Sequence, residues 1–215
     1  MKTKAKILGI TKFPYYEYDD KRNVIYYENR NGFWIRRKYD ENNKIIYFED
    51  SSGFWSKQKY DDKGNEIYYE DSNSYWYKRK FDDNDNKIYF ENCDDIWYKK
   101  KFDDYGNLIY FENSDGDWFK WKYDDKGNLI YYEDYHGDWT KQKFDDNGNI
   151  IYYDDSDDYR IKRKYDDNNN IIYYETSDGN WYKKKYDEDN KLIYFSNSDG
   201  DFWSKKHMPG TPNPY

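Results

Sequence analysis

The chain has 215 residues, of which 37% are charged, and its formal net charge is −8. So polar a composition would by itself suggest disorder, but 24% of the residues are aromatic, with 30 Tyr, 12 Phe and 9 Trp. Because hydrophobic residues of all kinds make up only 36%, few aliphatic side chains remain. The composition therefore excludes an ordinary core of Leu, Val and Ile, and it predicts packing between aromatic rings.

Several classes of protein are also excluded. No stretch approaches the roughly 18 consecutive apolar residues of a transmembrane helix, and the apolar run Ile7–Ile10 is too short for a secretion signal. The single cysteine, Cys93, cannot form an intramolecular disulfide and fits a reducing compartment. The acidic balance argues against non-specific binding to nucleic acid or to an anionic membrane. We therefore expect a cytoplasmic protein without membrane contact.

A repeat of 21 residues fills most of the sequence. Each copy begins with a Tyr or Phe, which we call the anchor, followed by Asp. Ile, then Tyr, then Tyr or Phe stand seven to nine residues after the anchor, and Glu follows them in seven of nine copies. Trp stands sixteen residues after the anchor in seven copies, and Lys stands twenty after it in all nine. The anchors are Tyr18, Tyr39, Tyr60, Phe81, Phe102, Tyr123, Phe144, Tyr165 and Tyr186.

Glycine marks two turns in each repeat. Ten of the twelve Gly stand four or fourteen residues after an anchor, where Asn, Asp or Ser fill most other copies. These residue types tolerate a positive φ, whereas all four Pro lie outside the repeats. Aromatic and β-branched residues fill the segments between the turns. The sequence thus predicts an all-β fold of about eighteen antiparallel strands, in nine tandem hairpin repeats that form a twisted or spiral extended sheet.

The parity of the repeat predicts which side chains share a face. Because 21 is odd, equivalent residues keep one face only if one loop is odd and the other even. We assign the N/D-S-x-G turn as a three-residue loop with its Gly in the left-handed region, and the D-D-x-G-N turn as a loop of two or four. The Ile and anchor columns then share one face with the variable positions. The other face carries the Tyr, Glu, Trp and Lys columns, with Glu70 opposite Lys57 and Glu112 opposite Lys99.

Three segments follow from these boundaries. We expect residues 1–17 to form an N-terminal cap whose Ile7, Leu8, Ile10 and Phe13 cover the first edge of the sheet. Residues 18–206 form the nine-repeat array, and residues 207–215 form a Pro-rich C-terminal tail.

The repeat resembles known families. Tyr123–Ile130 reads Y-D-D-K-G-N-L-I and resembles the YD repeat of RHS-type proteins, while the Y-Y-E-N-x-x-G-x-W part resembles MORN-variant repeats of bacteria. Tyr/Trp-rich repeat proteins of bacteriophages are similar too, and the resemblance covers residues 18–206. It implies a sheet-like shell, as in RHS proteins, or a binding and scaffolding surface, as in MORN proteins. Neither family contributes a catalytic residue.

Catalysis and metal binding find little support. Paired carboxylates such as Asp103-Asp104 recur once in each of the nine repeats, in the turn after the anchor, where Asp side chains bind nearby backbone N–H groups. They lack the unlike environments of a glycosidase pair and the spacing of an EF-hand. No Cys/His cluster has metal-ligand spacing, and no nucleophile has a local base. We expect no enzyme activity, no cofactor and no metal.

The Trp-x-Lys-x-Lys segments are the candidate ligand-binding residues. Trp and both Lys point the same way on a strand, as in single-strand nucleic-acid binding surfaces. The alternative, which we favour, is internal packing, with Lys stems over the rings and their heads paired to Glu. Aromatic stripes also stack on sugars. The candidates are Trp97, Lys99, Lys101, Trp118, Lys120, Lys122, Trp139, Lys141 and Lys143.

The sequence favours a non-enzymatic β-repeat protein that acts as a binding or scaffolding surface. We expect a phage or mobile-element gene, a protein partner, and action in the bacterial host cytoplasm, including the blocking of a host defence protein. The first alternative is a glycan or cell-surface binding module. The second is a single-stranded nucleic-acid binder, which the net charge of −8 disfavours.

Overall fold

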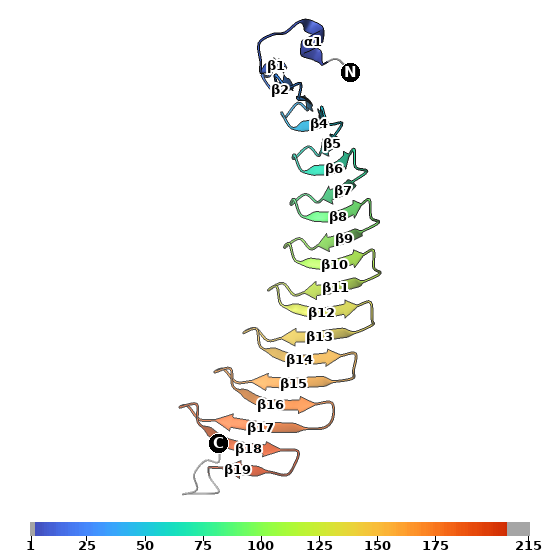
Figure 1. Cartoon of the computed structure of the whole chain (residues 1–215). Helices are drawn as coiled ribbons and strands as arrows, with labels where there is room; N and C mark the ends of the chain where they lie inside the picture. Colours follow the sequence, from blue (N-terminus) through green and yellow to red (C-terminus); the bar gives the residue numbers. More distant parts are fainter. Residues whose placement is uncertain (1–2, 206–215) are drawn as a thin grey trace. The chain divides into compact units, whose positions relative to one another are not determined.

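The computed structural model describes residues 3–205, and it contains one short helix and 19 strands. The strands are all antiparallel and form one open sheet, with each strand beside its neighbours in the sequence (Figure 1). The predicted all-β array of tandem hairpins is therefore confirmed. The strand beyond the predicted eighteen is β1 (Tyr15–Tyr18), most of which lies in the segment expected to be a cap.

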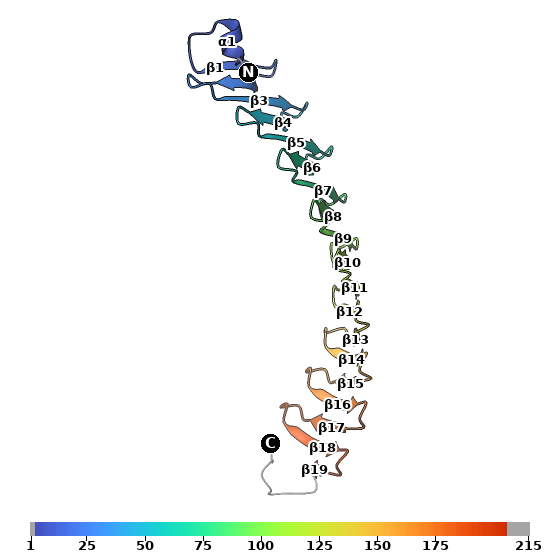
Figure 2. The same ribbon diagram turned by 45° about the vertical axis from the view of Figure 1, so that its right-hand side comes forward.

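The chain divides into two compact units, Met1–Lys100 with Asn113–Asp115, and Lys101–Glu112 with Gly116–Tyr215. In each unit the hairpins follow one another along the chain (Figure 2). The first unit contains α1 (Lys4–Leu8), β1, β2 (Val24–Glu28), β3 (Trp34–Tyr39), β4 (Ile45–Asp50), β5 (Trp55–Tyr60), β6 (Glu66–Asp71), β7 (Trp76–Phe81) and β8 (Lys87–Asn92). The division falls within β9 (Trp97–Phe102) and at the end of β10 (Leu108–Asn113). The second unit continues with β11 (Trp118–Tyr123), β12 (Leu129–Asp134), β13 (Trp139–Phe144), β14 (Ile150–Asp155), β15 (Arg160–Tyr165), β16 (Ile171–Thr176), β17 (Trp181–Tyr186), β18 (Leu192–Asn197) and β19 (Phe202–Ser204).

The N/D-S-x-G turn is a three-residue loop, as predicted. Between β12 and β13, the N–H of Asp134 donates to the carbonyl of Asp138 at 3.0 Å, and the N–H of Gly137 donates to the carbonyl of Asp134 at 3.0 Å. Gly137 has φ +87°, a conformation that is cheap for glycine because it has no Cβ. This is the common hairpin loop in which a type I turn is followed by a left-handed residue.

The D-D-x-G-N turn also has three loop residues, so the predicted loop of two or four is wrong. Between β11 and β12, the N–H of Asp124 donates to the carbonyl of Asn128 at 3.0 Å, and Gly127, with φ +82°, donates to Asp124. A β-bulge adds the one residue that the odd repeat length requires. Lys122 pairs with Tyr131 but Tyr123 pairs with Leu129, so one residue of β12 is inserted between these two pairs. The bulge changes the alternation of side chains by one residue, as an even loop would have done.

The bulge recurs at the same place in every repeat for which the register is described, and the inserted residue is the Ile seven residues after the anchor. We predicted that Ile shares the face of the anchor. As the inserted residue of the bulge, it does not lie cleanly on that face. In the first unit Ile67 lines one groove with Lys59 and Tyr68. In the second unit Ile172 occupies the equivalent place. The insertion is invisible to a count that assumes strict alternation.

Apart from Ile, the predicted assignment of faces is confirmed. Cross-strand partners share a face, and the register pairs Lys57 with Glu70, and Trp118 with Glu112. The Trp, Glu, Tyr and both Lys columns therefore lie together, on what we call the Trp–Lys face. The residues seventeen and nineteen after each anchor pair with the other aromatic column, as Trp121 pairs with Tyr132. We call their side the variable face.

Aromatic contacts replace a conventional core. Among the described residues, only Ala5 and Tyr26 are buried hydrophobic side chains. The rings of β6 to β9 instead form a series on the variable face, with centroids 5.3 Å apart for Tyr69 and Tyr77, 6.2 Å for Tyr77 and Phe90, and 5.6 Å for Phe90 and Tyr98. These distances fall within the range of favourable ring–ring contacts. The expectation of aromatic packing is met, in a single layer of sheet.

The N-terminal segment contacts the sheet through a buried carboxylate, while Ile10 and Phe13 of the expected cap are half-buried. The N–H of Ala5 and the hydroxyl of Tyr26 both donate to Oε2 of Glu28 at 2.9 Å, and Glu28 is only 2% exposed. Ile7 and Leu8, which we expected to cover the first edge, are 68% and 54% exposed. The predicted tail, residues 207–215, lies outside the described residues. No helix among those described is long and apolar enough to cross a membrane.

Candidate functional site

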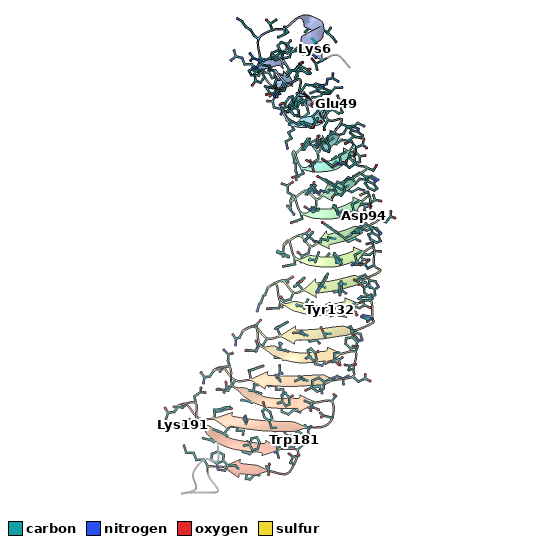
Figure 3. All side chains as sticks on the ribbon, in the orientation of Figure 1. Lys6, Glu49, Asp94, Tyr132, Trp181 and Lys191 are labelled. Atoms are coloured by element: carbon teal, nitrogen blue, oxygen red, sulfur yellow. The ribbon has the colours of Figure 1, made fainter. Side chains whose placement is uncertain are left out.

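The structure brings the predicted Trp and Lys residues to one face. Trp97, Trp118 and Trp139 are half-buried. The six candidate lysines are all exposed: Lys99, Lys101, Lys120, Lys122, Lys141 and Lys143. Figure 3 shows side chains projecting from both sides of the ribbon. The two Lys columns of this face, however, have different environments.

The first Lys column, eighteen residues after each anchor, contacts in most copies a Trp ring on its own strand and a Glu on the next strand. Lys120 Nζ lies 4.3 Å from the centre of the Trp118 ring on its own strand and 3.1 Å from Oε2 of Glu133 on the next strand. Lys57 makes the same two contacts with Trp55 and Glu70. Exposed ion pairs of this type contribute at most about 1 kcal/mol, so they mainly fix register. Further pairs are Arg36–Glu49, Lys78–Glu91 and Lys162–Glu175. These pairs support the internal-packing interpretation. Lys141 and Lys183 of the same column lie over Trp139 and Trp181 at 4.2 and 5.3 Å but make no ion pair within residues 3–205.

The second Lys column, twenty residues after each anchor, lacks such a carboxylate. Each described lysine lies with Nζ 5.4–5.9 Å from the centre of a Tyr ring on the next strand, as Lys122 does over Tyr131. None makes an ion pair within residues 3–205. The first unit contains Lys38, Lys59 and Lys80, and the second contains Lys101, Lys122, Lys143, Lys164 and Lys185. We call these exposed residues the unpaired Lys row.

Shallow, open grooves recur along this row. One groove, of about 890 Å³, is lined by Lys164, Ile172, Tyr173 and Lys185 among others. Equivalent residues line grooves of about 740 Å³ in the first unit and about 980 Å³ elsewhere in the second. The grooves combine exposed cations with Tyr rings. A Lys ammonium already lies over each Trp ring beside these grooves, as Lys141 does over Trp139. This contact disfavours the stacking of a sugar on the same ring face.

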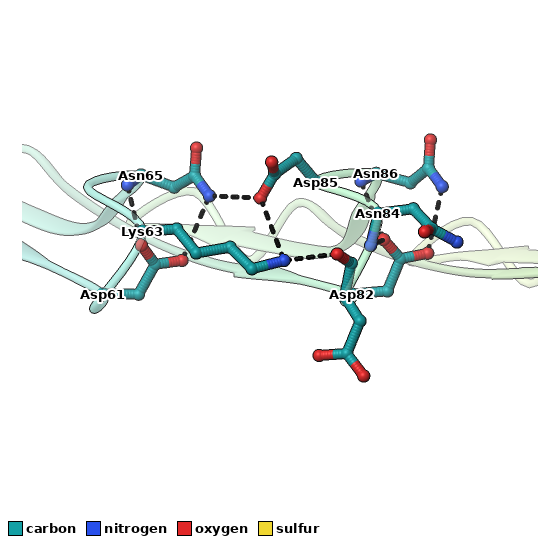
Figure 4. A network of polar contacts seen from close by, with 8 residues as sticks. Asp61, Lys63, Asn65, Asp82, Asn84, Asp85 and Asn86 are labelled. Carbon is teal, nitrogen blue, oxygen red and sulfur yellow. Dashed lines mark hydrogen bonds and ion pairs between the residues drawn. The ribbon is translucent and has the colours of Figure 1, made fainter.

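The paired carboxylates serve the turns, as the sequence predicted. In the turn after β5, Oδ1 of Asp61 accepts from the N–H of Asn65 at 2.8 Å (Figure 4). The side-chain amide of Asn65 reaches the next turn and donates to Asp85 at 3.0 Å, while Lys63 lies 3.5 Å from the same Asp85 oxygen. Neighbouring turns are thus connected. Within the described residues, no group of three or more His, Cys, Asp or Glu side chains could hold a metal ion.

The variable face is a second candidate surface, which the sequence analysis did not single out. On the same strands that carry the repeated Trp and Lys residues, the alternate positions differ from copy to copy. Seventeen residues after the anchor stand Ile35, Ser56, Tyr77, Tyr98, Phe119, Thr140, Ile161, Tyr182 and Trp203. Nineteen after it stand Arg37, Gln58, Arg79, Lys100, Trp121, Gln142, Arg163, Lys184 and Lys205. The signal that could have found this surface is the alternation of constant and changing columns.

Comparison with known proteins gives only distant likenesses. No family model matches the chain, and no curated protein matches its sequence. Among solved structures, a TcdB2-TccC3 structure aligns with a TM-score of 0.37 and 12% identity, over 90% of this chain and 13% of that one. The Tc holotoxin pore of Photorhabdus luminescens aligns with a TM-score of 0.36 and 12% identity, over 90% of this chain and 12% of that one. This chain therefore spans about an eighth of the chains it matches.

Proposed function

We propose that this chain is a non-enzymatic binding or scaffolding module that recognises a protein partner through its variable face. One observation carries the proposal. On the strands of the Trp and Lys columns, the residues sixteen, eighteen and twenty after the anchor are nearly constant and point to one face, while those seventeen and nineteen after it change and point to the other. Both faces meet the same demands of strand pairing. The difference between them therefore requires a reason other than the hairpin fold.

A folded protein supplies such a reason. Its surface does not repeat every two strands, so a repeat array that binds it needs a different side chain in each copy. The constant Trp–Lys face, by contrast, is largely occupied with its own ring–cation contacts and ion pairs. The variable face also offers Tyr, Trp and Arg, the residue types that contribute most to protein interfaces. Examples are Tyr77, Arg79 and Trp121.

The proposal includes the bacterial cytoplasm as the place of action and a phage or mobile-element gene as the source. The free Cys93 supports a reducing compartment, and the abundance of Asn, Lys, Ile and Tyr fits an AT-rich genome. Within this proposal, the protein partner is a host protein such as a defence protein.

The chain itself offers a matched variant for the test. Phe119→Thr with Trp121→Gln changes β11 from W-F-K-W-K-Y to W-T-K-Q-K-Y, which closely reproduces β13, W-T-K-Q-K-F. The immobilised chain would be incubated with a bacterial lysate, and bound proteins would be measured by mass spectrometry with soluble chain as competitor. We expect the double variant to lose a competed protein, and Lys122→Gln, on the opposite face, to retain it. The proposal would be contradicted if only Lys122→Gln lost the captured protein, or if the wild type, the double variant and Lys122→Gln captured it equally.

A second candidate function is the binding of single-stranded nucleic acid. It is favoured by the unpaired Lys row, whose exposed cations and Tyr rings recur in each unit. Cationic grooves with aromatic side chains are the usual means by which proteins hold a single strand. The acidic turns at the ends of most strands oppose it, because their carboxylates lie near the row.

A further inference from the structure

The variable face has its own ring–cation pattern. In three strands a ring stands seventeen residues after an anchor, and the residue two further along places a cation over it. Arg79 lies 4.1 Å from the centre of the Tyr77 ring, and Lys184 lies 4.7 Å from that of Tyr182. The same holds for Lys100 over Tyr98 at 5.0 Å. In these strands the chain supplies both the ring and the cation.

Strand β11 departs from this pattern. Phe119 takes the place of the ring, but Trp121 takes the place of the cation, and the two rings stack with centroids 5.7 Å apart. Tyr132 on β12 lies 6.3 Å from Phe119 and 6.2 Å from Trp121, and Tyr135 in the following loop meets Phe119 edge-on at 6.0 Å. Phe111 on β10 lies 6.1 Å from Phe119, so five rings gather on this face within the second unit. Tyr135 is 41% exposed.

The residues around these rings also differ, because acidic side chains stand where the compared strands have neutral ones. The residue opposite the ring is Asn92 for Tyr77 and Asn197 for Tyr182, but it is Asp134 for Phe119. Two residues before the ring stands Asp117, where the other two strands have Tyr75 and Asn180. The Asp134 carboxylate accepts from the hydroxyl of Tyr132 at 2.9 Å, which fixes it beside the rings. A third acid, Asp138, follows in the same loop.

We propose that this aromatic–acidic patch, formed by Phe119, Trp121, Tyr132 and Tyr135 and bordered by Asp117, Asp134 and Asp138, receives an Arg or Lys side chain of the protein partner. The inference rests on the proposed function and names the chemistry of one contact. Rings attract cations through their faces, and the attraction grows when carboxylates lie close by. The partner supplies the cation that Arg79, Lys100 and Lys184 supply elsewhere.

The charge of the patch decides between occupants. A nucleic acid would bring phosphates towards three carboxylates, which Coulomb repulsion opposes. A second copy of this chain carries exposed lysines and could also bring a cation to the patch. Self-association is therefore measured alongside binding.

The test uses the full chain labelled with ¹⁵N and the indole N–H signals of its nine Trp. The Trp121 signal is identified by its loss in Trp121→Gln. The probe is acetyl-Gly-Arg-Gly-Arg-Gly-amide, and its control is the same peptide with uncharged citrulline in place of Arg. We expect the Arg peptide to shift the Trp121 signal saturably, and the citrulline peptide to bind at least about fivefold more weakly.

Two variants make the result specific. Trp121→Arg changes β11 to W-F-K-R-K-Y, close to β7, W-Y-K-R-K-F, and gives the patch a cation of its own. Because Trp121→Arg lacks the Trp121 signal, isothermal titration calorimetry with the Arg peptide compares the wild type with both variants. We expect Trp121→Arg to weaken binding of the Arg peptide at least about fivefold, and Lys122→Gln, on the opposite face, to leave binding unchanged. Any of three results would overturn the inference. The two peptides would bind equally, or Trp121→Arg would bind the Arg peptide as tightly as the wild type does. The third is a Trp121 shift that depends only on the concentration of the chain.

Failure here differs from failure of the proposed function. If the peptide does not bind but capture of a protein still depends on other variable-face positions such as Tyr77 and Arg79, the patch is wrong and the function stands. If the peptide binds but capture is independent of the variable face, the patch stands as a cation site and the proposed function fails.

Discussion

The Tyr60 hydroxyl donates a hydrogen bond to the carbonyl of Ile45 at 3.2 Å, which joins an anchor to the preceding repeat. Tyr39 and Tyr165 make the same bond to Val24 and Ile150 at 3.1 and 3.3 Å. Each accepting residue directly precedes the inserted Ile of a bulge, where the regular ladder is interrupted. The anchor thus gives a hydrogen-bond donor to a carbonyl beside the irregular part of the strand.

Tyr60→Phe should therefore destabilise the chain by about 0.5–1.5 kcal/mol, the net contribution of one such hydrogen bond. The fold should persist, since Phe81, Phe102 and Phe144 are anchors already. Urea denaturation at pH 7 measures the change. The reverse variant, Phe81→Tyr, is the control and should be neutral or stabilising. Equal destabilisation by both variants would show that the ring, not the hydroxyl, sets the effect.

The 21-residue sequence repeat predicted most of the fold. Two Gly columns, a Pro-free interior and constant spacing are local signals, and they located the hairpins and the Trp–Lys face correctly. The inserted Ile was missed because a bulge and an even loop satisfy the same parity, and only the pairing of Lys122 with Tyr131 and of Tyr123 with Leu129 distinguishes them. The N-terminal contact was missed because it depends on Glu28, which reads in the sequence like every other Glu of its column.

Trp118→Ala should destabilise by about 1–3 kcal/mol, less than the loss of a fully buried Trp, because the ring is only half-buried. The substitution removes the surface over which Lys120 lies. Trp118→Arg should cost less, since Arg160 stands in the same column in β15 and lies 3.4 Å from Asp154. Thermal and urea denaturation give the values. A change below about 0.5 kcal/mol for Trp118→Ala would show that the ring is dispensable for stability and open to a ligand.

Gly116 has φ +88°, and a Cβ built on it would meet nothing within 4 Å. The cost of substitution is therefore conformational, not steric crowding by neighbours. Gly116→Val should destabilise by more than about 1 kcal/mol, because a β-branched residue disfavours positive φ. Gly116→Asn should be mild, since Ser74, Asp95 and Asp158 adopt φ of 58–66° at equivalent positions. Equal tolerance of both substitutions in denaturation experiments would contradict the three-residue loop.

Acid should weaken the turns. The side-chain amide of Asn128 and backbone N–H groups donate to Asp124 and hold the pKa of its carboxyl below the usual value. A lowered pKa contributes stability that is complete above about pH 4 and is lost as pH falls through the folded-state value. The pKa is lowered in the same direction for Asp19, Asp61, Asp82, Asp103, Asp145, Asp166 and Asp187.

Asp124→Asn tests this prediction because it keeps an oxygen acceptor and removes the titration. The variant should be less stable than the wild type at pH 7, and the difference should shrink between about pH 4 and pH 2. Urea denaturation across this range measures it. Asp125→Asn, at the exposed neighbouring residue of the same loop, is the control and should change little. A difference that is constant with pH would assign the effect to shape and not to charge.

The candidate sites were only half predictable. The sequence placed Trp118, Lys120 and Lys122 on one face and set a Glu opposite the first Lys column, as the structure has for Lys120 and Glu133. It did not predict that Lys122 lies over the Tyr131 ring without a carboxylate. Both lysines have the same spacing and the same residue type. The difference follows from register, which aligns Glu with the first Lys column and Tyr with the second.

The unpaired Lys row makes a last prediction possible, on single-stranded nucleic acid. We expect the chain not to bind a fluorescently labelled single-stranded DNA even near about 50 mM salt, where charges still act over roughly 10 Å. The acidic turns and the net charge of −8 repel the strand. Fluorescence anisotropy measures binding, and added salt would weaken any complex steeply through counterion release. If a complex forms, Gln at Lys101, Lys122, Lys143 and Lys164 should abolish it, whereas Gln at the matched first-column residues Lys99, Lys120, Lys141 and Lys162 should not. That pattern would favour the second candidate function over protein recognition.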